Sequence, residues 1–253
     1  MRFTDKVAVV TAFANGIGRA TAEIMSREGA FVVGIDNHPE RIDSAVAALR
    51  GIGQAHGRLC DALDQSQVDA TVAAIAEEFG RIDILVNAVG GSTIIANSSA
   101  NVDELTFDEW QRLIAFNLNG TFLFTHAVVP LMKRQKRGKI VNLASIAGRG
   151  LSASSSSAYA AAKGGIIAFT RKLAYELGPY DVTINAIAPS LTLTERIRPH
   201  WDKRTQEAQA AEIARTPLRR VAEAADQAKV ICFLASSDAD FVTGVTIDVT
   251  GGN

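Results

Sequence analysis

The sequence predicts an α/β fold: a single domain with a doubly wound parallel sheet and helices on both faces. Short apolar runs rich in β-branched residues alternate with longer segments of helical composition along the whole chain. Continuous apolar runs of this kind are typical of parallel strands that are buried on both faces. No Pro/Ser-rich linker and no fixed-period repeat breaks the alternation, so we expect one domain over residues 1–253.

These patterns assign the elements in chain order. Strands are expected at residues 7–11, 31–36, 82–86, 140–144, 182–187 and 245–249, with a further strand that reaches residues 59–61. Helices are expected at residues 18–28, 41–50, 68–79, 107–135, 158–169 and 223–234, and residues 92–104 read as a loop. In such a sheet, ligands bind beyond the carboxyl ends of the strands. The residues that follow strand ends should therefore line one edge: Asp36, Asp61, Asn87, Ser145 and Pro189.

Composition excludes several classes of function. The chain is 47% hydrophobic and 21% charged, with a net charge of −1, which gives no field that would attract nucleic acid or an anionic membrane. Cys60 and Cys232 are far apart and have no paired Cys/His spacing, so we expect no metal site and a reducing compartment. No signal peptide is visible, and no apolar stretch approaches the roughly 20 residues that span a bilayer. The expected location is the cytoplasm.

Three residues suggest a reaction. Tyr159 and Lys163 are four residues apart in a helical segment and therefore share a face. A neighbouring ammonium is expected to lower the pKa of the phenol from roughly 10 toward the range useful for acid–base catalysis. Ser145, at the end of the preceding strand, would hold a substrate oxygen, with the serines at 152 and 154–157 as less fitting alternatives. Together they predict a site that interconverts an alcohol and a carbonyl, although a Tyr/Lys pair at this spacing also occurs by chance.

The turn after the first strand predicts a site for a hydride carrier. Gly16 and Gly18 open the first helix, where backbone N–H groups approach a pyrophosphate. Asp36 follows about 20 residues later at the end of the second strand, where a carboxylate accepts hydrogen bonds from adenosine ribose hydroxyls and repels a 2′-phosphate. We therefore expect NAD(H) in preference to NADP(H). The alternative role for Asp36 is a helix cap or turn acid.

The chain resembles the short-chain dehydrogenase/reductases in an ordered set of motifs that covers nearly its whole length. The matching positions are residues 11–18, 87–90, Asn117, Ser145, Tyr159-x-x-x-Lys163, residues 185–194 and residues 248–252. The resemblance implies a Rossmann-type NAD(P)(H) oxidoreductase that acts on a small-molecule alcohol or ketone and forms a homotetramer or homodimer. Within that class, we expect a dehydrogenase for a secondary alcohol or 3-hydroxyacyl compound. A 3-oxoacyl-carrier reductase and a catalytically silent cofactor-binding subunit are the alternatives.

The same resemblance implies roles for individual residues. Tyr159 would be the acid/base, Ser145 would orient the substrate, and Lys163 would bind the nicotinamide ribose and lower the pKa of Tyr159. Asn117 would hold a water in the proton relay. The remaining cofactor contacts would come from Thr11, Asn15, Gly16, Ile17, Gly18, Asp36, Asp61, Ala62, Asn87, Ala88, Gly90, Pro189, Ser190, Leu191, Thr192 and Thr194.

Three positions depart from the family pattern. Ala12 stands where the first glycine of TGxxxGxG is usual, and a methyl group costs on the order of 1 kcal/mol there if φ is positive. Ala88 replaces an asparagine, and Ser190 replaces a glycine. None of these changes removes a proton-transfer residue.

The charged segment 191–220 would form the lid over the reacting carbon. A solvated amphipathic lid helix is the simpler interpretation of its charges. The alternative is that Arg196 or Arg198 meets an anionic group, such as a substrate carboxylate or the phosphates of an acyl-thioester carrier.

Overall fold

A parallel seven-stranded sheet forms the centre of the protein in a computed structural model that describes residues 1–152 and 154–253. The strand order is β3-β2-β1-β4-β5-β6-β9, and every pair within this sheet is parallel. The strands are β1 (Val7–Thr11), β2 (Phe31–Asp36), β3 (Gln54–Leu59), β4 (Ile84–Asn87), β5 (Gly138–Leu143), β6 (Val182–Pro189) and β9 (Thr246–Val249). The predicted doubly wound, Rossmann-type fold is confirmed.

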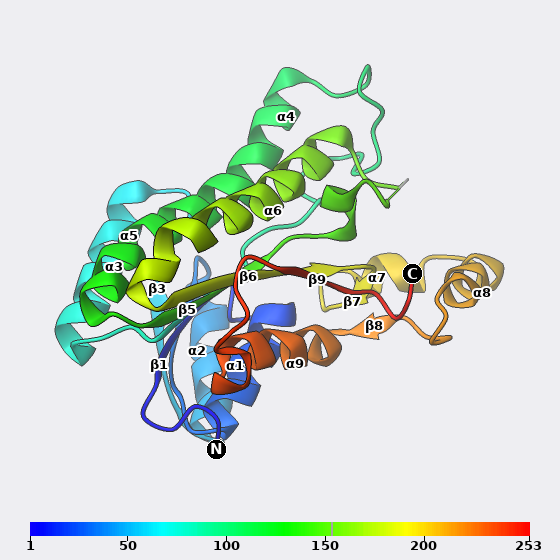
Figure 1. The fold of residues 1–253 in the computed structure, drawn as a ribbon. Coiled ribbons are helices and arrows are strands. Elements are labelled where there is room, and N and C mark those ends of the chain that lie inside the picture. Colours follow the sequence, from blue (N-terminus) through cyan, green and yellow to red (C-terminus); the bar gives the residue numbers. More distant parts are fainter. Residues whose placement is uncertain (153) are drawn as a thin grey trace.

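Helices cover both faces of the sheet (Figure 1). One face carries α1 (Gly16–Arg27), α2 (Pro39–Arg50) and α9 (Ala224–Ala235). The other carries α3 (Gln65–Phe79), α4 (Phe107–Ile114), α5 (Gly120–Gln135) and α6 (Ser157–Leu177). Alternate residues of β1 enter the two cores, with Ala8 and Val10 toward α1 and Val7 and Val9 toward α3, so the whole strand is apolar.

The lid differs from the single amphipathic helix that the sequence suggested. It contains β7 (Thr192–Leu193), α7 (Arg198–Asp202) and α8 (Gln206–Arg215). β7 pairs in parallel with β8 (Ala222–Glu223), and this two-stranded ladder ties the lid to the start of α9. In Figure 1 this part of the chain extends beyond one edge of the main sheet.

The run Phe107–Gln135 is more apolar than expected. Among the described residues it is the one helical run that is long and apolar enough to cross a membrane by length and composition, with a mean hydropathy of 1.3 over its best window. The expectation that no stretch approaches this length is therefore wrong. Phe124, Val128 and Met132 of the run are buried in the core against the sheet, which accounts for its hydropathy without a bilayer.

Candidate active site

Ser145, Tyr159 and Lys163 come together at the carboxyl end of β5. Ser145 follows the strand, and its hydroxyl accepts a hydrogen bond of 3.2 Å from the amide of Ala147. This hydrogen bond caps a short 3-10 helix. The hydroxyl of Ser156 caps α6 by accepting from the amide of Tyr159 at 3.4 Å, so the tyrosine lies in the first turn of this helix. Lys163 follows one turn later, and its Nζ lies 5.7 Å from the centroid of the Tyr159 ring. The predicted common face is confirmed.

The titration behaviour of this pair differs from the expectation. Burial raises the pKa of Tyr159, while interactions with the Ser145 hydroxyl and the Arg196 guanidinium lower it less. Burial also lowers the pKa of Lys163 to about 7. Lys163 is not among the groups that lower the pKa of Tyr159. The expectation that Lys163 lowers the pKa of Tyr159 is wrong for this structure, because desolvation outweighs the charge effect.

Asn117 reaches the same place from an irregular part of a helix. It lies in a π-helical turn, Ala115–Asn119, between α4 and α5, and it is fully buried. Such turns often occur at functional sites because they redirect a side chain. The Asn117 amide donates to the carbonyl of Gly91 at 3.1 Å and accepts from the Gly91 amide at 2.8 Å. The asparagine thus fixes the backbone that follows β4.

Gly90 brings Asn117 and Lys163 together. Its φ is +150°, and a Cβ atom at this position would lie 2.7 Å from Oδ1 of Asn117 and 2.9 Å from Nζ of Lys163. Any side chain here would displace one of the two polar groups. Lys163 is 3% exposed, and its ammonium donates to the carbonyl of Leu143 at 2.7 Å.

The turn between β1 and α1 has the geometry of a phosphate site. Gly16 has φ +58°, and a Cβ on Gly18 would lie 2.3 Å from the carbonyl oxygen of Ala12, so only glycine fits there. The amide of Gly16 donates at 2.8 Å to a carboxylate oxygen of Glu195, which reaches across from the lid. An anionic oxygen therefore already binds the N-terminus of α1, where a cofactor phosphate is expected. The residues present fit a dinucleotide.

Ala12 and Asp36 lie next to this glycine turn. Ala12 has φ 49°, so the condition for strain at the substituted glycine position is met. A carboxylate oxygen of Asp36 lies 3.4 Å from the amide of Ala14, and the other accepts from the amide of Asn37 at 2.9 Å. Asp36 therefore lies at the end of β2, beside the glycine turn, as predicted.

Some predicted cofactor residues hold the sheet together instead of facing the cleft with their side chains. The hydroxyl of Thr11, 1% exposed, accepts from the amide of Ala88 at 2.9 Å. The amide of Asn87, 2% exposed, donates to Thr125 and Asn142, while its Oδ1 has no partner among the described residues. These side chains fix where β1, β4 and β5 end.

The other predicted positions lie around the rim. Asp61 is exposed and accepts from the amide of Leu63 at 2.9 Å, whereas Ala62 is buried. Pro189 ends β6, and Ser190 and Leu191 continue as half-buried residues. The methyl group of Thr194 lies 3.2 Å from where a Cβ of Gly16 would be, so the lid closes directly over the glycine turn.

The sequence reasoning missed the roles of Glu195 and Gly91. The sequence analysis gave neither residue a role, although the place of Glu195 next to Thr194 was a usable signal. The φ of +152° at Gly91 and its packing against Arg196 become visible only in three dimensions.

A buried Tyr159 beside Ser145 and Lys163, and a glycine turn at a helix N-terminus on one doubly wound sheet, are the arrangement expected of an oxidoreductase. Comparison with known proteins agrees. A family model described as "Enoyl-(Acyl carrier protein) reductase" matches residues 12–253. The chain belongs to the short-chain dehydrogenase/reductase family, and it is an oxidoreductase of that family.

Relatives align over nearly their whole lengths. The 3-oxoacyl-[acyl-carrier-protein] reductase of Thermotoga maritima is 34% identical, over 100% of this chain and 99% of the relative. The crystal structure of a levodione reductase superposes with a TM-score of 0.91 at 34% identity, covering 99% of this chain and 98% of that one. A 3-oxoacyl-[acyl-carrier protein] reductase with bound NAD from Brucella melitensis gives 0.88 at 36% identity, covering 99% and 92%.

Proposed function

We propose that the protein is an NAD(H)-dependent dehydrogenase that interconverts a secondary alcohol, or a 3-hydroxyacyl compound, and its ketone. The observation that carries this proposal is that Tyr159 lies beside both Ser145 and Lys163, and that Lys163 and Asn117 meet at Gly90. This cluster lies at the same sheet edge as the N-terminus of α1. A bound nicotinamide would supply the carbon that accepts or donates the hydride. Gly16 and Gly18 would hold its phosphates, Asp36 its adenosine ribose, and Lys163 its nicotinamide ribose.

The roles proposed for the four polar residues follow from their surroundings. The hydroxyl of Ser145 donates a hydrogen bond to the substrate oxygen and orients the carbinol carbon. The phenolate form of Tyr159 would accept the hydroxyl proton in oxidation, and the phenol form would return it in reduction. Burial that raises the pKa of Tyr159 keeps the phenol protonated near neutral pH, which suits proton donation to a ketone. Asn117 keeps the Gly90 backbone against Lys163, and it would hold a relay water.

The preference for NAD(H) is proposed from Asp36. A carboxylate beside the glycine turn accepts hydrogen bonds from the 2′- and 3′-hydroxyls of the adenosine ribose, and it repels a 2′-phosphate. In a titration followed by nicotinamide fluorescence, NADH should bind roughly tenfold tighter than NADPH or better. Asp36→Asn should reduce this difference, whereas the control Asp43→Asn in α2 should leave it unchanged. Tighter binding of NADPH to the native protein would refute the role given to Asp36.

Two other functions remain as alternatives. The first is a 3-oxoacyl-carrier reductase, which is the name of the Thermotoga relative. A structure that carries the same name contains bound NAD, so a preference of this protein for NAD(H) would not argue against that function. Carrier-linked and free substrates compared with the same enzyme would separate the two. A catalytically silent cofactor-binding subunit is disfavoured because every proton-transfer residue is in place. NADH binding without oxidation or reduction of any tested compound would support it.

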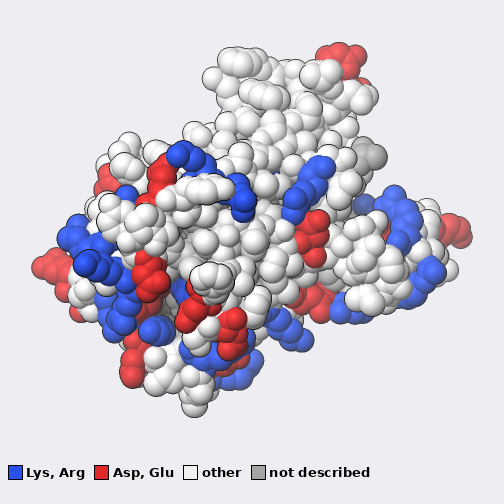
Figure 2. Space-filling model, viewed as in Figure 1, with Lys and Arg blue, Asp and Glu red and all other residues white. Residues whose placement is uncertain are grey.

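We infer further that residues 1–253 form one domain with 191–220 as its lid, and that the protein is a cytoplasmic homotetramer or homodimer. The face over α4 and α6 carries few charges (Figure 2). Phe122 of α5 is 46% exposed, its ring stacks on His126 at 5.4 Å, and it meets Phe169 of α6 edge-on. An exposed aromatic cluster favours burial against a second copy. Phe122→Asp should lower the mass measured by light scattering, whereas an unchanged mass would exclude this interface.

A further inference from the structure

Arg196 of the lid lies against the glycine turn that follows β4, next to the catalytic candidates. A Cβ atom on Gly91 would lie 2.3 Å from Nη2 and 2.6 Å from Cζ of Arg196, so the guanidinium packs directly on the Gly91 backbone. The preceding residue, Gly90, meets Lys163 in the same way. The charge of Arg196 acts on both Tyr159 and Lys163. The guanidinium therefore lies beside the acid–base pair.

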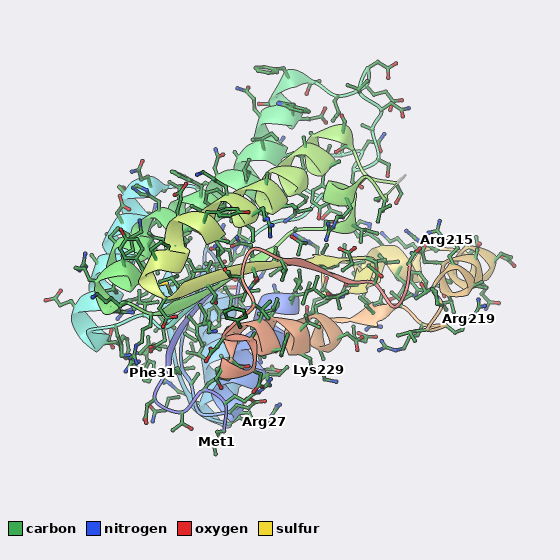
Figure 3. The ribbon with its side chains drawn as sticks, in the orientation of Figure 1. Met1, Arg27, Phe31, Arg215, Arg219 and Lys229 are labelled. Carbon is green, nitrogen blue, oxygen red and sulfur yellow. The ribbon has the colours of Figure 1, made fainter. Side chains whose placement is uncertain are left out.

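The guanidinium of Arg196 has no hydrogen-bond or ion-pair partner among the described residues. In the part of the chain that the structure describes, no ion pair and no side-chain hydrogen bond engages Arg196, and the adjacent acid, Glu195, is bound to the Gly16 amide instead. Four of the other five lid arginines are paired with acids: Arg198 with Glu223 at 3.1 Å, Arg204 and Arg215 with Glu212, and Arg220 with Asp226. The fifth, Arg219, donates to the carbonyl of Ala214. Arg215 and Arg219 lie around α8, at the outer end of the lid (Figure 3).

An unpaired cation in a cleft favours an anionic ligand. Partial desolvation lowers the pKa of Arg196, and Lys163 adds a second basic group that faces the same Gly90–Gly91 turn. A guanidinium presents two parallel N–H donors that match a carboxylate. The side chain remains exposed toward solvent, so a ligand can reach it.

We propose that Arg196 binds a carboxylate of the substrate, and that the substrate is a hydroxy acid whose carboxylate lies a few bonds from the carbinol carbon. This inference rests on the proposed function. In oxidation, the carbinol hydride passes to NAD⁺ and the hydroxyl proton passes to the deprotonated oxygen of Tyr159, which becomes the phenol. The carboxylate is unchanged, and the products are an oxo acid and NADH. The phosphates of an acyl carrier fit less well, because the long pantetheine arm separates them from the reacting carbon whereas Arg196 lies beside Tyr159.

The test compares acids with their uncharged counterparts. Oxidation of 2-, 3- and 4-hydroxy acids of four to six carbons and of the matching primary amides is followed by NADH absorbance. The acids should be favoured in kcat/KM roughly ten- to a hundredfold. Arg196→Gln should abolish this preference mainly through KM, and Arg196→Lys should restore part of it. Arg198→Gln is the matched control, because it removes a lid arginine that is paired with Glu223, and it should leave the preference unchanged.

Each outcome decides the proposal. Amides used as well as acids by the native enzyme, or an acid preference that survives in Arg196→Gln, would overturn it. The proposal would also be overturned if the enzyme oxidised none of the hydroxy acids and calorimetry detected no binding of these acids to the NADH complex. An Arg196→Gln variant that loses NADH affinity and keeps the acid preference would assign Arg196 to the cofactor phosphates. Oxidation of neutral alcohols alone would refute the role of Arg196 while leaving the proposed function intact.

Discussion

Lys163 makes the stability of the cofactor-free protein depend on pH. The residue is 3% exposed, and its ammonium donates to the carbonyl of Leu143 at 2.7 Å. Burial lowers its pKa from 10.5 to about 7. The unfolded chain therefore binds the lysine proton between these two values while the folded protein does not, and the free energy of unfolding rises with pH. Below pH 7 both states are protonated, and the burial penalty is constant.

The expected size follows from the shift. In the middle of this window the slope approaches about 1.4 kcal/mol per pH unit, and the whole shift corresponds to an upper limit of about 5 kcal/mol. Burial raises the pKa of Cys232 to about 12 from 9.0, which makes stability fall above pH 9. The measurement is therefore confined to pH 7 to 9, where the lysine dominates.

The assay is urea unfolding of three proteins at pH 7, 8 and 9. Lys163→Met keeps the volume of the side chain without its charge, so its free energy of unfolding should lack the rise that the native protein shows. Lys172→Met is the control, because the side chain of this lysine, on the same helix, is 71% exposed. Equal slopes for the native protein and Lys163→Met would show that Lys163 titrates normally and would refute the reasoning.

Two further predictions concern the glycine turn. Ala12→Gly should raise the free energy of unfolding by about 0.5–1 kcal/mol, because relief of positive-φ strain exceeds the added flexibility of the unfolded chain. Ala20→Gly inside α1 should lower it by about as much, and a loss of stability in both variants would contradict this account. Glu195→Gln should tighten NADH binding roughly two- to fivefold, because Glu195 competes for the Gly16 amide. Calorimetry checks this against Glu207→Gln on the lid surface, and unchanged affinity would show that Glu195 does not compete.

Local patterns predicted most of the fold. The expected first and second strands have the observed bounds, because each is a compact apolar run between a polar loop and a turn. The third strand was less clear, since β3 (Gln54–Leu59) is the edge strand of the sheet and only Ala55 of its six residues is buried. Apolar residues do not recur along this strand with a clear period. Edge strands are the elements for which hydrophobic patterning says least.

The sequence predicted where the site residues lie better than it predicted how their side chains interact. Spacing placed Tyr159 and Lys163 on one face, and strand ends placed Asp36 and Ser145 at one edge. Desolvation is a property of the packed structure, so the reversed direction of the Tyr159 pKa was not accessible from the sequence. The Asn87 side chain points inward because it donates a hydrogen bond to Asn142 on the neighbouring strand, and this contact likewise could not be predicted from the sequence.

The central claim is that Tyr159 exchanges the proton while the cofactor binds independently of it. Tyr159→Phe removes only the phenol oxygen, so turnover of the best alcohol should fall roughly 10²- to 10⁴-fold, with NADH affinity unchanged. Tyr175→Phe, on the same helix and 69% exposed, should retain full turnover. Native-like turnover in Tyr159→Phe would contradict the account and would require another group to carry the proton.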